Sequence, residues 1–282
     1  MIPLDINIKK QFVASVHELQ NLPTLVYKYR DISNPFHLKL ITRQEIFFSS
    51  PADFEDSLDC KLPTDYSLLT EDDILKHFIE ESLSKNPYYT PLEHLQWASY
   101  WSKHSPIRDK EYVKKVNQEH MQRYFSRVGV LSVTAVPDNI DMWNKYSLNR
   151  TGFCVGFNSK MLFSITSTGG GEVQYLDEIP KLHPFENPDI EHSIQVYCKE
   201  KKWAFEKEYR CYKFWDHDIV AITERQIKVP IPTFSEVIIG DLMPQNEKIG
   251  LIELIKTILP NVVIKTIRHN DIDNSIQVID IH

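Results

Sequence analysis

The chain has 282 residues, of which 42% are hydrophobic and 25% charged, as is ordinary for a soluble globular protein with a sizeable core. Its net charge of −7 argues against broad affinity for nucleic acid, which needs a basic face. The four cysteines stand singly, without a CxxC pair. They argue against a zinc ribbon or a disulfide framework and indicate a reducing compartment.

No segment approaches the roughly 18 apolar residues of a membrane span, and the opening MIPLDINIKKQF lacks the apolar run of a signal peptide. We therefore expect a cytoplasmic protein with no membrane partner.

The first part of the chain predicts two strands and a helical block. Residues 5–20 are expected to form a helix, Thr24–Arg30 a strand, and EIFFSS (residues 45–50) a second strand, because aromatic and β-branched residues dominate both strands. From Thr70 the sequence TEDD marks a helix start. The pattern then stays helical, with breaks only at prolines, so we expect a helical insertion at about 65–127.

The rest of the chain returns to strands. VGVLSVTAV and GFCVGF are apolar and favour strands, with a short helix at NIDMWNKYS between them. Further strands are expected at GEVQYL, Glu208–Phe214, QIKVPI, SEVIIG, NVVIKTI and SIQVIDI, and a helix at NEKIGLIELIKTIL. Strands on both sides of a helical block, without regular βα alternation, predict one α+β domain (1–282) on a mixed, twisted β-sheet.

The motifs of common nucleotide-binding and hydrolytic sites are absent: there is no Walker A loop, GxGxxG, GxSxG or HExxH. A weak metal-nuclease pattern is present. Pro188-Asp189 followed by Glu200-Lys201-Lys202 spells PD…ExK, the residue types that hold Mg²⁺ and assist an attacking water. We keep a Mg-dependent nuclease as an alternative function.

The stretch KKWAFEKEYRCYKFW (Lys201–Trp215) carries the densest charge pattern. If its second half is a strand, Glu206, Glu208 and Arg210 point to one side, because strand side chains alternate. Such a row is either the edge of an active site or the salt-bridged face of a non-catalytic binding or sensor module. In the second case each exposed ion pair contributes less than about 1 kcal/mol to the free energy of unfolding.

Four blocks resemble the bacterial domain-of-unknown-function family DUF2971: LVYKYR, IFFSSPADFEDSLD, MWNKYSLNRTGFCVGF and KKWAFEKEYR. They run in the family's order from Val26 to about Gly240. The chain departs from the family at residues 55–58, where an asparagine-aspartate-proline is usual. The resemblance implies a family without a settled activity, in which a toxin or phage-defence role is plausible.

The order of three of these blocks is also similar to that of ADP-ribosyltransferases. There, a first strand gives a polar residue for NAD, a second an aromatic–serine edge beside nicotinamide, and a late strand a glutamate. A histidine is missing at Tyr29. The resemblance implies an ADP-ribosyltransferase-like fold and an enzyme that uses NAD as its substrate. ADP-ribose would pass to an unknown acceptor, protein or nucleic acid, or the NAD would simply be cleaved.

The same resemblance implies the site residues. Glu208 would be the catalytic carboxylate, stabilising the positive charge that develops on the ribose, and Glu206 its helper toward the acceptor. The residues implied to hold NAD are Tyr27, Tyr29, Arg30, Phe48, Ser49, Ser50 and Arg210. No metal is expected in this site.

Overall fold

The computed structural model describes residues 22–165 and 170–281. The helix expected at 5–20 lies outside the described residues. The helices are α2 (Pro35–Thr42), α3 (Glu71–Lys85), α4 (Pro91–His104), α5 (Lys110–Arg127), α6 (Ile140–Tyr146), α7 (Ser159–Ser164), α8 (Pro188–Tyr197) and α9 (Gln245–Ile258). The strands are β1 (Leu25–Arg30), β2 (Glu45–Phe47), β3 (Val128–Thr134), β4 (Phe153–Asn158), β5 (Gly170–Glu172), β6 (Gln174–Leu176), β7 (Cys198–Glu200), β8 (Glu208–Phe214), β9 (Gln226–Lys228), β10 (Phe234–Ile239), β11 (Val263–Asn270) and β12 (Ser275–Asp280).

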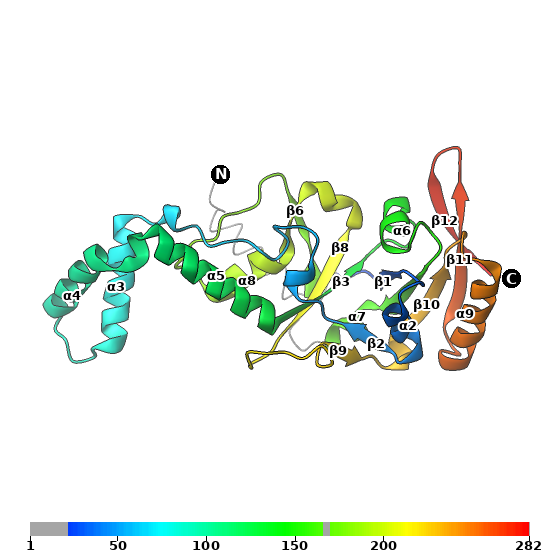
Figure 1. Ribbon diagram of the computed structural model, residues 1–282, viewed down its shortest axis with the longest axis horizontal. Coiled ribbons are helices and arrows are strands. Elements are labelled where there is room, and N and C mark those ends of the chain that lie inside the picture. The colour runs from blue at the N-terminus through cyan, green and yellow to red at the C-terminus, as the bar shows by residue number, and fades with distance from the viewer. Residues whose placement is uncertain (1–21, 166–169, 282) are drawn as a thin grey trace.

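The core is a mixed sheet in the order β12-β11-β10-β4-β1-β3-β8-β5, flanked by helices (Figure 1). β10 and β11 run parallel, whereas β1 lies antiparallel to both of its neighbours, β3 and β4. Two small sheets, β2-β9 and β6-β7, complete the strands. The predicted α+β fold on a mixed sheet is therefore confirmed.

Successive side chains of each strand point to opposite sides of the sheet. Both faces carry buried residues, because other parts of the chain pack against each of them. On one face Val26 and Val155 pack with apolar residues of α2, α7 and α9. On the other face Tyr27, Tyr29 and Cys154 pack against Met142 and Trp143 of α6. The α6 face carries the candidate site.

The ladder between β1 and β3 is short. Among the described residues the two strands pair only at Tyr27 and Thr134, although β1 pairs with β4 along its whole length. Beyond that pair Val130 bridges instead to Ser49, which follows β2. The sheet is thus open between β1 and β3, next to its centre.

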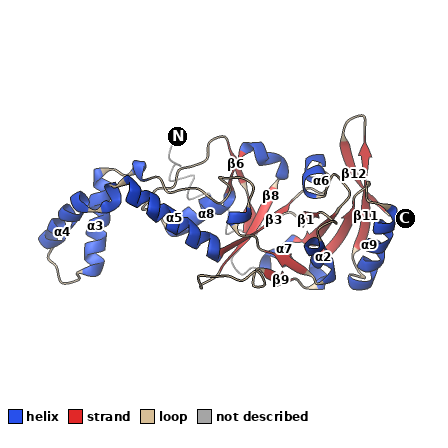
Figure 2. Ribbon diagram, viewed as in Figure 1, coloured by secondary structure: helices blue, strands red, loops and turns tan. Residues whose placement is uncertain are grey.

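The helical block expected at about 65–127 forms an arm (Figure 2). In this view α3 and α4 lie far from the sheet, and α5 leads back to β3. Capping boxes at Thr70 and Thr90 start α3 and α4. The two helices share a small cluster of Ile74, Phe78 and Ala98, whereas α5 buries no residue. No helix in the described part of the chain has both the length and the apolar character that crossing a membrane requires.

The structure differs from the expected elements in three places. Glu206 lies in a short 3₁₀-helix, η5 (Lys201–Glu206), and not in the strand, because Lys207 adopts the left-handed conformation (φ 40°) and ends η5 before β8 begins. GEVQYL divides into β5 and β6, which belong to different sheets. Helix α8 was not expected, although Asn187 caps it and Pro188 stands at its first turn.

Candidate functional site

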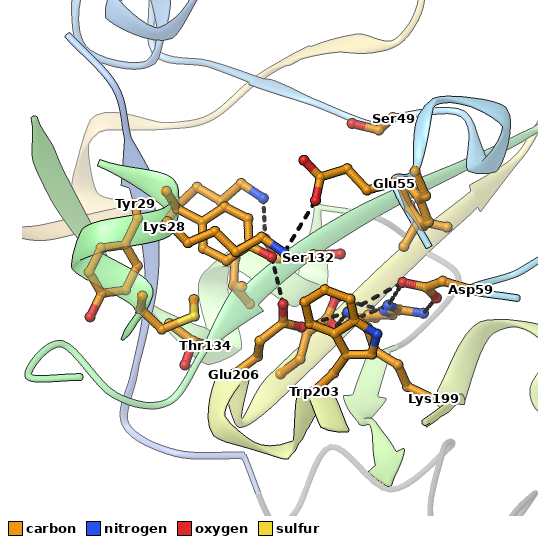
Figure 3. Close-up of a pocket in the computed structure, with 18 of the residues that line it drawn as sticks. Lys28, Tyr29, Ser49, Glu55, Asp59, Ser132, Thr134, Lys199, Trp203 and Glu206 are labelled. Atoms are coloured by element: carbon orange, nitrogen blue, oxygen red, sulfur yellow. Dashed lines mark hydrogen bonds and ion pairs between the residues drawn. The ribbon is translucent and has the colours of Figure 1, made fainter. Parts of the chain in front are cut away.

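A pocket of about 280 Å³ opens on the α6 face, where β1 and β3 part (Figure 3). Its walls come from β1, the segment that follows β2, β3, α6, β7, η5 and the start of β8. The register explains this convergence. Tyr27, Thr134 and Glu208 stand side by side across three strands, and Ser132 stands beside Arg210. A row of polar side chains therefore crosses the sheet beneath the pocket.

The centre of the site is a buried charge cluster of Asp59, Lys199, Glu206, Glu208 and Arg210, each less than a tenth exposed. Lys199 Nζ lies 2.6 Å from Glu206 Oε2, 3.1 Å from Glu208 Oε2 and 3.3 Å from Asp59 Oδ2. The predicted row of glutamates and arginine is therefore a buried network and not a solvated sheet face.

All the N–H donors of the Arg210 guanidinium form hydrogen bonds within the protein. It donates to both carboxylate oxygens of Asp59 (2.7 and 2.8 Å), to both of Glu208 (2.7 and 3.0 Å) and to the carbonyl of Val196 (2.7 Å). A guanidinium has five N–H donors, and these five bonds account for them. Arg210, expected to hold NAD, is placed to fix the two carboxylates.

Negative charge exceeds positive charge in the cluster. Three carboxylates (Asp59, Glu206, Glu208) face two cations (Lys199, Arg210), which leaves one net negative charge when the acids are ionised. Burial by itself would raise the pKa of Glu208, but the charges of Arg210 and Lys199 outweigh it and hold this pKa well below its usual range. Glu208 is therefore an anion at any physiological pH.

The two glutamates differ in their free hydrogen-bonding capacity. Glu208 accepts bonds from Arg210 at both oxygens, from Lys199 and from the Ser132 hydroxyl. Glu206 accepts one bond at each oxygen, from Lys199 and from the Tyr146 hydroxyl at 2.5 Å. A carboxylate offers about four lone-pair positions, so Glu206 keeps capacity for a ligand and Glu208 has none left.

An aromatic rim stands beside Glu206. The Trp203 indole donates to Asp56 (2.6 Å), and the Lys145 ammonium lies 3.9 Å from the Trp203 ring centroid. Lys145 also pairs with Glu55 at 3.2 Å. The phenol of Tyr146 stays protonated, because burial and the nearby Glu206 charge raise its pKa far above the usual range. The rim therefore presents apolar ring faces, while Asp56 and Glu206 already accept the hydrogen bonds of Trp203 and Tyr146.

Five of the seven residues expected to hold NAD line this pocket: Tyr27, Tyr29, Arg30, Ser49 and Arg210. The Tyr29 hydroxyl donates to the Val136 carbonyl at 2.9 Å, so its ring forms the wall while its polar end is occupied.

Phe48 and Ser50 do not line the pocket, contrary to expectation. Phe48 is fully buried in the core on the opposite face, because its side chain alternates away from that of Ser49. The Ser50 hydroxyl donates to the Phe125 carbonyl at 2.9 Å and caps the short helix η2 (Pro51–Asp53). Both side chains have structural roles.

Sequence reasoning missed Asp59, Lys199 and Lys28. Asp59 ends the block IFFSSPADFEDSLD, so its place in that block is a usable signal. Lys199 lies in β7, close in sequence to the two glutamates of the cluster, but its contact with Asp59 joins distant segments that no short motif reveals. Lys28 lies between the two tyrosines that were chosen in β1. Tyr146, whose role the sequence left open, contacts Glu206.

The PD…ExK residues do not meet in one site. Asp189 begins α8, a helix of 10 residues and so about 15 Å long, whereas Glu200 follows its other end and pairs with Lys202. Across residues 22–165 and 170–281 no group of three or more histidine, cysteine, aspartate or glutamate side chains is placed to hold a metal ion.

Residues 142–211 match the model of a family described as "Protein of unknown function (DUF2971)". The matched segment runs from α6 to β8 and contains four of the five residues of the charge cluster, together with Tyr146. No curated protein and no solved structure matches the chain. The match confirms, for residues 142–211, the resemblance to the DUF2971 family that the sequence blocks predicted.

Proposed function

We propose that the pocket binds the nicotinamide–ribose half of NAD and that the protein cleaves the bond between them. The observation that carries this proposal is the excess negative charge of the buried cluster, which reaches the pocket through Glu206. When the C1′–N bond breaks, its electron pair leaves with nicotinamide and positive charge develops on the ribose. A fixed, desolvated carboxylate stabilises that charge in the transition state.

The low pKa of Glu208 suits this reaction. Nicotinamide leaves as a neutral molecule, so the leaving group needs no proton and the site needs no general acid. Water, or a hydroxyl or other nucleophile of an acceptor, then forms the new bond to C1′ and loses a proton. Glu206 is the group that accepts this proton, because it retains free lone pairs beside the pocket.

This proposal exchanges the roles first expected for the two glutamates. Glu206 is the catalytic carboxylate that touches the substrate, and Glu208 supplies a fixed charge that Arg210 and Lys199 hold in place. The pocket volume of about 280 Å³ is at the lower limit of small-molecule sites. It supports enclosure of the nicotinamide and its ribose, with the adenylate half outside.

The test is nicotinamide release from NAD by purified variants. Glu206→Gln should lower kcat by about 10²–10³-fold, the usual effect of removing one transition-state contact, with KM little changed. Glu55→Gln is the matched control, since Glu55 also lines the pocket but its side chain is 81% exposed. It should stay within about threefold of wild type, because an exposed pair contributes little.

Two results would overturn the proposal: full activity of a folded Glu206→Gln protein, or no nicotinamide release and no NAD binding by the wild type. A chelator distinguishes NAD cleavage from the alternative, a Mg-dependent nuclease. Release should be the same with and without it, whereas a nuclease acting through Asp189 and Glu200 would cleave nucleic acid and stop when Mg²⁺ is removed.

A further inference from the structure

Two cations of β1, Lys28 and Arg30, line the pocket at the opening between β1 and β3. Lys28 Nζ donates to the Ser132 carbonyl at 2.5 Å, an acceptor that the β1–β3 ladder leaves free where it stops. Figure 3 shows the Lys28 side chain extending into the pocket beside Ser132. The amine therefore lies at the gap itself.

These two cations differ from the others at the pocket. Lys145, Lys199 and Arg210 each pair with a carboxylate within 3.3 Å. Within the part of the chain that the structure describes, neither Lys28 nor Arg30 forms such a pair. Two neighbouring basic residues thus line the pocket, and no carboxylate of the described residues lies within ion-pair distance of either.

The surroundings make this arrangement costly. Burial lowers the pKa of Lys28 to about 7; the nearby Arg30 charge adds to this lowering, and the charges of Glu208 and Glu206 oppose it. Burial likewise lowers the pKa of Arg30 to about 10. The other titratable or charged groups near Lys28 are Arg210 and Cys211 of β8 and His37 of α2. Each cation would gain from a bound anion, which favours its charged form.

The pocket is divided by charge. The β1 side carries the unpaired cations, and the side formed by η5 and β8 carries the excess negative charge. A complementary ligand has a cationic or electron-poor end and an anionic end, separated by a short spacer.

We propose that Lys28 and Arg30 form an anion subsite, at the opening between β1 and β3, for a phosphate or pyrophosphate group of the ligand. Its assignment to the phosphates next to the nicotinamide riboside of NAD rests on the function proposed above. Arg30 offers a planar, bidentate donor set and Lys28 a compact charge, which together suit phosphate oxygens.

The first test compares ligands that differ by one phosphate. Wild-type protein should bind nicotinamide mononucleotide at least tenfold more tightly than nicotinamide riboside, as measured by calorimetry. Lys28→Met and Arg30→Met should each remove most of that difference and leave the affinity for the riboside unchanged. Lys28→Arg should retain it, and Lys76→Met, which removes an exposed lysine of α3 that does not line the pocket, should not alter it.

Inorganic pyrophosphate and sulfate test the subsite without NAD. Both should bind to the wild type and bind at least tenfold more weakly to Lys28→Met. Sulfate does not titrate in this range, so its affinity should fall above pH 7, by up to tenfold per pH unit, as Lys28 loses its proton. Lys28→Arg should flatten this dependence.

The outcomes distinguish the two proposals. If pyrophosphate and sulfate bind through Lys28 but no nicotinamide compound binds, the subsite stands and the NAD proposal fails. If folded Lys28→Met and Arg30→Met bind every phosphate-bearing ligand as the wild type does, or if the wild type binds neither inorganic anion nor discriminates mononucleotide from riboside, the subsite is overturned.

Discussion

Glu206 and Glu208 show how two neighbouring acids acquire different tasks from their contacts alone. Glu208 is saturated with donors and permanently charged, whereas Glu206 is held by one ammonium and one phenol and keeps acceptor capacity. The resemblance to ADP-ribosyltransferases makes Glu208 the expected catalytic carboxylate and Glu206 its helper. The left-handed Lys207 places Glu206 outside β8; Arg210 then bonds Glu208, whereas Tyr146 bonds Glu206.

At the same scale, Arg210 is expected to dominate stability. Arg210→Met leaves Asp59 and Glu208 buried with too few partners, and breaking a buried ion pair in this way typically costs about 3–5 kcal/mol of unfolding free energy. Urea denaturation measures the loss.

The matched control is Arg108→Met. Arg108 pairs with Glu71 at the surface, where the two side chains are 42% and 76% exposed, so Arg108→Met should lower the unfolding free energy far less than Arg210→Met does. Equal losses in the two variants would contradict the account of the buried cluster.

At the scale of elements, the imidazole ring of His192 on α8 contacts both the arm and the sheet. His192 lies between Tyr124 of α5 and Tyr212 of β8, with ring centroids 5.9 and 4.2 Å away. Burial lowers the pKa of His192 to about 4. The charged form is thus strongly disfavoured in the folded state.

This predicts an acid-dependent loss of stability. The unfolded histidine takes up a proton near pH 6.5 and the folded one only near pH 4, so the contribution is complete above pH 6.5 and is lost as the pH falls toward 4. His192→Phe should make the unfolding free energy depend less on pH between pH 6.5 and pH 4. The comparison must be between the two proteins, since His120, whose pKa Glu191 raises, acts in the opposite direction. Parallel profiles would exclude the role given to His192.

Most elements were predictable because their signals are local. The residues LVYKYR, IDMWNKY and QNEKIGLIELIKTI carry their own alternation or helical spacing, and each forms the expected element. The division of residues 170–176 between two sheets was not predictable, since β5 pairs with β8 and β6 with β7 through partners distant in the chain. For the same reason the sequence indicated Glu206, Glu208, Tyr27 and Arg30 but not the network that joins Asp59 to Lys199.

On the scale of the whole molecule, the arm and the sheet differ in how much they bury. The arm has one small apolar cluster and a connecting helix, α5, without buried residues, whereas β4 is almost wholly buried in the sheet. Segments with few buried contacts open at lower free energy. Hydrogen exchange should therefore be faster in peptides from α3, α4 and α5 than in peptides from β1, β3 and β4. Protection of α4 equal to that of β4 would show that the arm is held as firmly as the sheet.

Residues from β1, the segment that follows β2, β3, α6, β7, η5 and β8 together form the pocket. The most direct measurement is a proton NMR time course of NAD with the wild-type protein. The account predicts that NAD resonances broaden on binding and that free nicotinamide appears as the ribosyl-linked signal decays, unaffected by chelator. NAD resonances that neither broaden nor decay in the presence of folded protein would contradict the central claim.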